Sequence, residues 1–159
     1  GRMLGLTRTD LSSLEYAAKL HDIGKIGVHE DILNKDGPLS NEEFDLMKAH
    51  PTFSHEIILP IKFLASCRAG VLHHHERIDG KGYPHGLRGE EIPLQARIIS
   101  VCDAFDAMTS TRSYRGAMPV SKAVEIMLEV AGSQLDEAIT HLFVEHLEEI
   151  TGMPAVIKG

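Results

Sequence analysis

Hydrophobic residues along this chain recur mostly at spacings of three and four, which is the period of an α-helix with one buried face. No stretch alternates between apolar and polar residues for long enough to predict a substantial β-sheet. The pattern therefore predicts an all-α fold. Helices are expected at residues 11–23, from Ser40 to about His50, and at 52–59, 63–76, 94–110, 119–131 and 136–150.

Several of these segments have recognisable limits. Gly24 follows the first segment, where a glycine commonly ends a helix. Ser40 has Glu43 three residues later, which is the pattern of a capping box. Residues 28–39 are expected to form a turn region, and the glycine-rich stretch 79–93 a loop. The segment 94–110 is apolar on nearly all sides, which predicts a central helix.

Composition favours one globular domain. The chain has 159 residues, of which 43% are hydrophobic and 25% charged, so we expect a domain over residues 1–150 and a peripheral tail over 151–159. A net charge of -7 argues against binding of a nucleic-acid polymer. No apolar run is long enough to predict a membrane span. We expect a cytoplasmic protein in which Cys67 and Cys102 are reduced core residues.

The ten histidines are the chemical feature that needs explanation. His21 shares an apolar stripe with Leu14 and Ala18, and His74 and His75 lie on another. Each has a structural alternative, because a lone histidine on such a stripe is more often a buried core residue than a ligand. That alternative is weaker for two adjacent inward histidines beside a glycine-rich loop, whereas His73 is expected outside the ligand set.

Asp103 lies on the most hydrophobic segment, in phase with Ala96 and Ile99. An unpaired buried carboxylate is costly, so Asp103 needs a cation. A metal ion is one candidate, and Arg97 is the structural alternative. Asp106, one turn later, is a second candidate ligand or supports one.

Together the inward residues exceed the three or four ligands of a single tetrahedral zinc site. They fit two ions about 3.5–4 Å apart, an arrangement used for phosphoester hydrolysis, in which the carboxylate of Asp22 bridges the ions. The candidate ligands are His21, Asp22, His50, His74, His75 and Asp103.

Cationic and aromatic residues stand near these candidates in the sequence. Lys25 follows the His-Asp pair, and Arg112 and Arg115 follow the 94–110 segment. Such side chains suit phosphate oxygens. Tyr83, in the glycine-rich loop, suits stacking on a base. Ordinary solvated surface is the alternative for each of them.

The motifs "LHDIGK", "MKAHP", "HHERIDGKGYP" and "ARIISVCDAFDAMTS", followed by a "YR" pair, occur in this order. The chain thereby resembles the HD-GYP family, a branch of the HD-domain metal-dependent phosphohydrolases, over about residues 11–147. The resemblance implies an HD-domain helical bundle with two or three divalent ions of Fe, Mn or Zn. It also implies hydrolysis of cyclic di-GMP to linear pGpG, and in some members to GMP.

By position, the resemblance assigns metal binding to the six candidate ligands named above. It assigns catalytic roles to Asp22 and Lys25, and substrate contacts to Lys25, Tyr83, Arg112 and Arg115. The chain departs from the family at Ile78, Ser113 and Gly116. The family also has an upstream helix with a further histidine ligand, which we expect to be missing here.

We therefore expect a piece of a longer protein with a sensory or receiver domain, acting near GGDEF-type domains. Two alternatives stay open. The domain binds a nucleotide or a partner with little or no turnover, or it hydrolyses a related cyclic dinucleotide.

Overall fold

The computed structural model describes residues 1–111 and 116–153. Helices and loops make up the whole of this part of the chain, with two isolated bridges and no strand, so the predicted all-α fold is confirmed. The elements are η1 (Arg2–Leu4), α1 (Arg8–Leu20), η2 (Ile23–Gly27), α2 (Glu30–Leu33), α3 (Asn41–Met47), α4 (His50–Ile58), η3 (Lys62–Cys67), α5 (Arg68–His73), η4 (Gly89–Glu91), α6 (Leu94–Thr109), α7 (Val120–Val130), α8 (Glu137–Glu145) and α9 (Leu147–Thr151).

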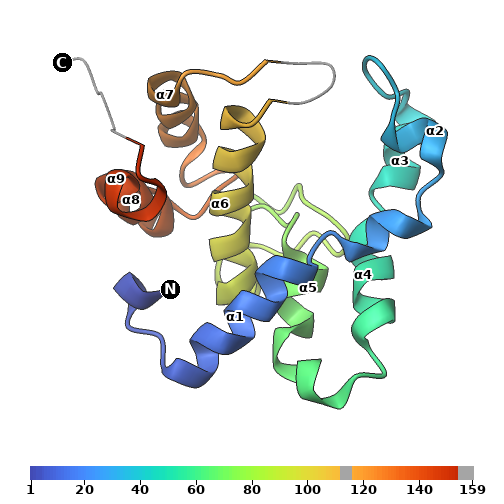
Figure 1. The fold of residues 1–159 in the computed structure, drawn as a ribbon, viewed down its shortest axis with the longest axis horizontal. Helices are drawn as coiled ribbons and strands as arrows, with labels where there is room; N and C mark the ends of the chain where they lie inside the picture. The colour runs from blue at the N-terminus through green and yellow to red at the C-terminus, as the bar shows by residue number, and fades with distance from the viewer. Residues whose placement is uncertain (112–115, 154–159) are drawn as a thin grey trace.

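Helix α6 runs through the middle of the molecule, with α7, α8 and α9 on one side and α1, α4 and α5 on the other (Figure 1). Its side chains enter both hydrophobic clusters: Val101 and Phe105 pack with residues of α7 and α8, and Ile99 packs with residues of α1, η3 and α5. The prediction of a central helix is confirmed. Because α6 joins the two clusters, Asp103 is held between the two halves of the fold.

Gly24 does not end a helix, as the sequence suggested. Helix α1 stops at Leu20, and Gly24 lies inside the 3₁₀ turn η2, packed against α4. A Cβ atom at this position would lie 2.1 Å from the His50 carbonyl oxygen and 2.3 Å from the Ser54 nitrogen. The Gly24 N–H donates to Ser54 Oγ at 2.8 Å, and this hydroxyl donates to the His21 carbonyl at 2.7 Å. Glycine is therefore required here for close approach.

Helix boundaries also differ from the predicted ones in other parts of the chain. The predicted turn region 28–39 contains α2, and the segment 63–76 divides into η3 and α5. The last predicted segment divides at His146 into α8 and α9. Helix α3 begins at the predicted Ser40–Glu43 capping box but ends at Met47, so His50 is the first residue of α4. Pro51 explains this break, because proline is tolerated in the first turn of a helix and not in its interior.

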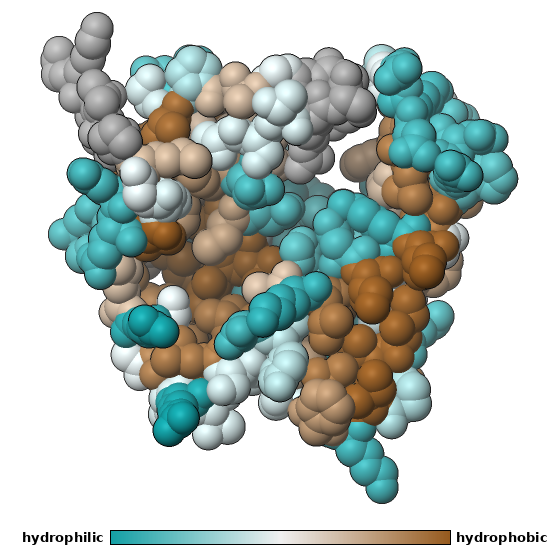
Figure 2. Space-filling view, in the orientation of Figure 1, coloured by the Kyte–Doolittle hydropathy of each residue, from teal (hydrophilic) through white to brown (hydrophobic). Residues whose placement is uncertain are grey.

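The two cysteines have different surroundings. Cys67 is buried, as expected, whereas Cys102 is exposed, which contradicts the prediction of a core residue. Cys102 lines an apolar hollow between the N-terminal segment, α6 and α8, together with Ile98 and Phe143 (Figure 2). Within the described ranges, no helix has the length and apolar character needed to cross a bilayer.

Candidate metal centre

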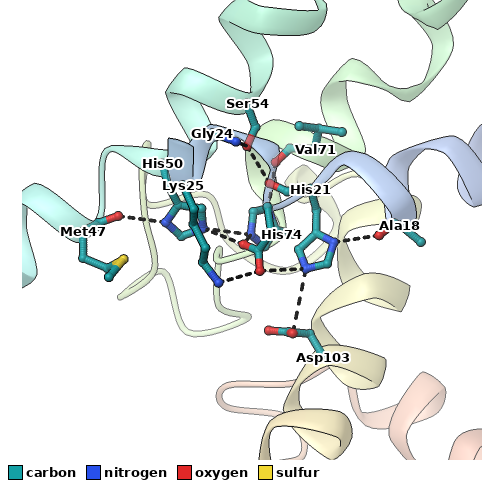
Figure 3. Close-up of polar contacts among 11 residues, drawn as sticks. Ala18, His21, Gly24, Lys25, Met47, His50, Ser54, Val71, His74 and Asp103 are labelled. Carbon is teal, nitrogen blue, oxygen red and sulfur yellow. Dashed lines mark hydrogen bonds and ion pairs between the residues drawn. The ribbon is translucent and has the colours of Figure 1, made fainter. Parts of the chain in front are cut away.

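Four parts of the fold bring the candidate ligands together. His21 and Asp22 form the turn between α1 and η2, and His50 begins α4. His74 and His75 directly follow α5, and Asp103 projects from α6. Figure 3 shows His21, His50, His74 and Asp103 pointing toward a common point, although they come from separate parts of the chain. Neither His21 nor Asp22 is inside a helix, contrary to the predicted segment 11–23.

Three of the histidines are oriented in the same way. The Nδ1 atoms of His21, His50 and His74 lie 2.8, 2.8 and 2.7 Å from the carbonyl oxygens of the residues three positions earlier. A carbonyl oxygen only accepts, so Nδ1 carries the proton in each ring. The Nε2 atoms are then left with free lone pairs. This fixed tautomer is the one that metal-binding histidines commonly adopt.

These lone pairs face one another. His50 Nε2 lies 3.4 Å from His74 Nε2, and with both protons on Nδ1 neither atom has a hydrogen to donate. Asp22 Oδ1 lies 3.1 Å from His50 Nε2 and accepts no hydrogen bond within the described residues. Two lone pairs and a carboxylate oxygen at these separations repel unless a cation or a proton lies between them. The donor set therefore fits a metal ion.

Asp22 joins two groups of candidate ligands. Its side chain, with His50, His74 and His75, offers ligand atoms that all lie within 4.8 Å of one another. Its other oxygen, Oδ2, lies 3.5 Å from His21 Nε2. His21 Nε2, which is buried and without a hydrogen bond, is in turn 3.8 Å from Asp103 Oδ1. This arrangement is the one expected of a carboxylate shared by two ions.

Burial keeps two of the histidines neutral. Desolvation, reinforced by the neighbouring His75, lowers the pKa of His74 to about 3, and desolvation with the neighbouring His50 lowers the pKa of His75 to about 4. Burial alone would raise the pKa of Asp22, but the ammonium group of Lys25 holds that pKa far below its ordinary value. His74 and His75 are therefore neutral and Asp22 is ionised, which are the protonation states that bind metals. For His21, burial alone would lower the pKa, but contacts with Asp103 and Asp22 raise it above its ordinary value.

The lowered histidine pKa values predict a loss of stability in acid for the metal-free protein. A histidine in the unfolded chain has a pKa near 6.5. Below that pH, His74 and His75 therefore bind protons in the unfolded chain but not in the folded protein. The contribution of these two histidines to the free energy of unfolding should be fully present above pH 6.5. As the pH drops toward 4, the free energy of unfolding should fall by about 1.4 kcal/mol per pH unit for each histidine. Urea unfolding of the metal-free protein at pH 7, 6 and 5 measures this dependence.

In His74→Gln, the free energy of unfolding should depend less steeply on pH, because one of the two contributing histidines is absent. The exposed His29 provides the control, because His29→Gln should leave the dependence as in the wild type. Equal pH dependence in all three proteins would contradict the assignment of His74 as a buried neutral histidine.

A large groove adjoins the cluster. It has a volume of about 1170 Å³ and extends from the cluster to the segment that contains α2 and α3. Lys25, His75 and Tyr83 line it, and Lys25 Nζ donates to Asp22 Oδ2 at 2.5 Å. The Tyr83 ring stacks on the His75 ring, with centroids 4.8 Å apart and 27° between the planes. The groove thus places a cation and an aromatic ring beside the metal ligands.

The remaining predicted residues have different outcomes. Arg112 and Arg115 lie outside the described residues. Arg97, the structural alternative as a partner for Asp103, instead donates to Asp136 at 2.7 Å. Asp106 accepts a hydrogen bond from Ser110 and has no place among the clustered ligand atoms.

Glu76 is a residue whose role the sequence analysis missed. Its carboxylate is buried and accepts the N–H groups of His85 at 2.8 Å and Leu87 at 3.1 Å. It thereby holds the glycine-rich loop that presents Tyr83. Gly82 lets this loop pack closely, because a Cβ there would lie 2.4 Å from the Arg77 nitrogen. An acidic residue directly after two inward histidines was the signal that could have identified this role.

Comparison with known proteins gives consistent matches. The family model of the HD domain matches residues 1–139. A 3'3'-cGAMP-specific phosphodiesterase of Vibrio cholerae is 44% identical over 138 residues, covering 85% of this chain and 29% of the relative. A cyclic di-GMP phosphodiesterase of Thermotoga maritima is 40% identical over 152 residues, covering 93% of this chain and 41% of the relative. The chain therefore spans well under half the length of these relatives.

Solved structures agree with the fold. An HD-GYP-type protein from Bdellovibrio bacteriovorus superposes with a TM-score of 0.73 at 23% identity, over 96% of this chain and 47% of that protein. A cyclic GMP-AMP-specific phosphodiesterase of Vibrio cholerae superposes with a TM-score of 0.70 at 19% identity, over 98% of this chain and 43% of that protein.

Proposed function

The chain belongs to the HD-domain family, in its HD-GYP branch, and from this membership we propose that it is a metal-dependent phosphodiesterase that hydrolyses cyclic di-GMP to linear pGpG. The main support for this proposal is that the Nε2 atoms of His50 and His74 face each other, with an oxygen atom of Asp22 beside them. These three side chains need a cation, and a groove of sufficient size for a dinucleotide opens beside them.

Each residue then has a definite task. Asp22 uses both carboxylate oxygens, one toward His50 and His74 and the other toward His21. His75 and Asp103 complete the ligand set. Two divalent ions held there would supply Lewis-acid stabilisation of the phosphate and would activate water. Mixed nitrogen and oxygen donors suit Fe, Mn and Zn alike.

We further propose that Lys25 binds the substrate phosphate. Its ammonium group lies on the groove wall, and in the absence of substrate it is paired with Asp22 Oδ2. A cation aimed at a phosphate stabilises the negative charge that builds there during the reaction. Tyr83 would contact the substrate from the facing loop, and Arg112 and Arg115 keep the phosphate-binding role that the sequence predicts.

Lys25→Met should lower kcat/KM by about 10²-fold, the scale of removing one stabilising donor, while the metal content stays unchanged. Steady-state kinetics together with metal analysis of the same sample measures both quantities. Lys62→Met is the control, because Lys62 is exposed on η3 and should leave both values unchanged. Loss of the metal in Lys25→Met, or full activity, would contradict the role.

The substrate is tested by incubating the purified protein, loaded with Mn²⁺ or Fe²⁺, with cyclic di-GMP or 3'3'-cGAMP and separating the products. The proposal predicts the linear dinucleotide pGpG from cyclic di-GMP. Faster cleavage of 3'3'-cGAMP would favour the second candidate, which the 44% identity to a phosphodiesterase specific for that nucleotide supports. Nucleotide binding without any product would instead identify a signalling module and overturn the proposal.

The curated relatives bear on which other domains accompany this one. A response regulator of Xanthomonas campestris named as a cyclic di-GMP phosphodiesterase is 38% identical, and this chain covers 41% of it. We propose that this chain likewise works with a sensory or receiver domain. GGDEF-type partners and a cytoplasmic location stay predictions.

A further inference from the structure

A second cluster of possible metal ligands lies outside the six residues of the centre. His73, Glu76 and His85 each offer one nitrogen or oxygen atom, and these atoms lie within 4.8 Å of one another. The Glu76 N–H donates to the His73 carbonyl at 2.9 Å, which closes a turn directly after α5. His73 Nδ1 lies 3.5 Å from Glu76 Oε1. The rings of His73 and His85 have centroids 5.2 Å apart.

Among residues 1–111 and 116–153, no lysine or arginine pairs with the negative charge in this cluster. The Glu76 side chain is 0% exposed, and within the described residues its only contact at ion-pair distance is His73. Its oxygens otherwise accept two backbone N–H groups. His73 Nδ1 is buried and has no hydrogen bond within the same part of the chain. A buried carboxylate and an unpartnered ring nitrogen thus face each other, which is costly unless a cation or a proton lies between them.

The distances suit a tetrahedral ion. Zinc bonds of about 2.0–2.2 Å place neighbouring ligand atoms about 3.3–3.6 Å apart, and the separation of His73 and Glu76 falls in this range. His85 is exposed, so its ring is free to turn toward the ion, and an ion can enter from solvent on that side. Two histidines and one glutamate are a known zinc ligand set that leaves a fourth position open.

We propose that His73, Glu76 and His85 form a second metal site, separate from the His-Asp centre, which binds a divalent transition-metal ion such as Zn²⁺. The ion would join Glu76, which precedes the glycine-rich loop, to His85 within that loop. Tyr83 lies between these two residues and stacks on His75, so binding of the ion would brace the loop against the centre. The proposal concerns metal binding alone and stands whether or not the proposed function holds.

The test is Zn²⁺ binding, measured as ions per chain and as affinity by competition with a chromophoric chelator. His85→Ala should remove one ion per chain or weaken that ion's binding by at least about 10-fold. His141→Ala is the matched control, because His141 is exposed on α8 and should bind Zn²⁺ as the wild type does. Circular dichroism would show that each variant is folded.

The same comparison in an Asp22→Asn background separates the two sites. The proposal predicts that Asp22→Asn with His85→Ala binds one tight Zn²⁺ ion fewer per chain than Asp22→Asn alone. Equal Zn²⁺ binding with and without His85, or loss of every ion in Asp22→Asn alone, would overturn the proposal. Neither result depends on turnover of a nucleotide, so the proposed function is tested independently.

Discussion

Asp22→Asn should abolish metal-dependent hydrolysis of cyclic di-GMP. The substitution removes the charge of a carboxylate that contacts both groups of candidate ligands. Loss of a residue that merely supports a ligand commonly costs about 10–100-fold in activity or metal affinity. Loss of the shared ligand should exceed that range, so we expect kcat/KM to fall by more than about 100-fold, with fewer bound ions at the centre. Steady-state kinetics and metal analysis measure the two effects.

Asp31→Asn is the control for this experiment. Asp31 is almost fully exposed on α2 and pairs only with His29 among the described residues. Its substitution should change neither activity nor metal content. If Asp22→Asn kept wild-type activity, the carboxylate would not be a ligand, and the proposed centre would be wrong.

Gly24→Ala should destabilise the fold. The added methyl group would collide with the His50 carbonyl and the Ser54 backbone, which are atoms of α4 and not the ends of flexible side chains. Overpacking commonly costs about 1–3 kcal/mol and occasionally more. At the upper end of that range, the melting temperature should fall by roughly 6–12 °C for a domain of this size.

Thermal unfolding of the metal-free protein checks this expectation, because stability then includes no contribution from bound ions. Gly116→Ala is the matched control, since a Cβ there would meet nothing within 4 Å. Gly24→Ala should also bind metal more weakly, because η2 positions Asp22 against His50. An unchanged melting temperature would mean that η2 does not pack on α4 as described.

The helices and the candidate ligands could be predicted because their signals are local. The spacing of apolar residues identified α6 as central, and the Ser40–Glu43 pair identified the start of α3. Ionisable residues on apolar stripes, such as His74 and Asp103, pointed to the centre for the same physical reason. Burying such groups is unfavourable unless something binds them.

Other features depend on contacts between distant residues and could not be read from the sequence. Gly24 is required by the backbone of α4, thirty residues away along the chain, and a local pattern described it as a helix end. His50 was assigned to the wrong helix because its spacing from Met47 also fits a continuous one. Glu76 binds loop amides nine and eleven residues later, so its role appears only when the loop is folded.

The central claim is that the clustered side chains hold ions that the reaction requires. Its most direct test is a titration of the metal-free protein with Mn²⁺, in which bound ions and the rate of cyclic di-GMP cleavage are measured in the same samples. Because the second site proposed above also binds metal, the titration uses His85→Ala. We expect no cleavage without metal and a rate that reaches its maximum as the second ion binds. Cleavage by the metal-free protein, or intact substrate when two ions are bound, would contradict it.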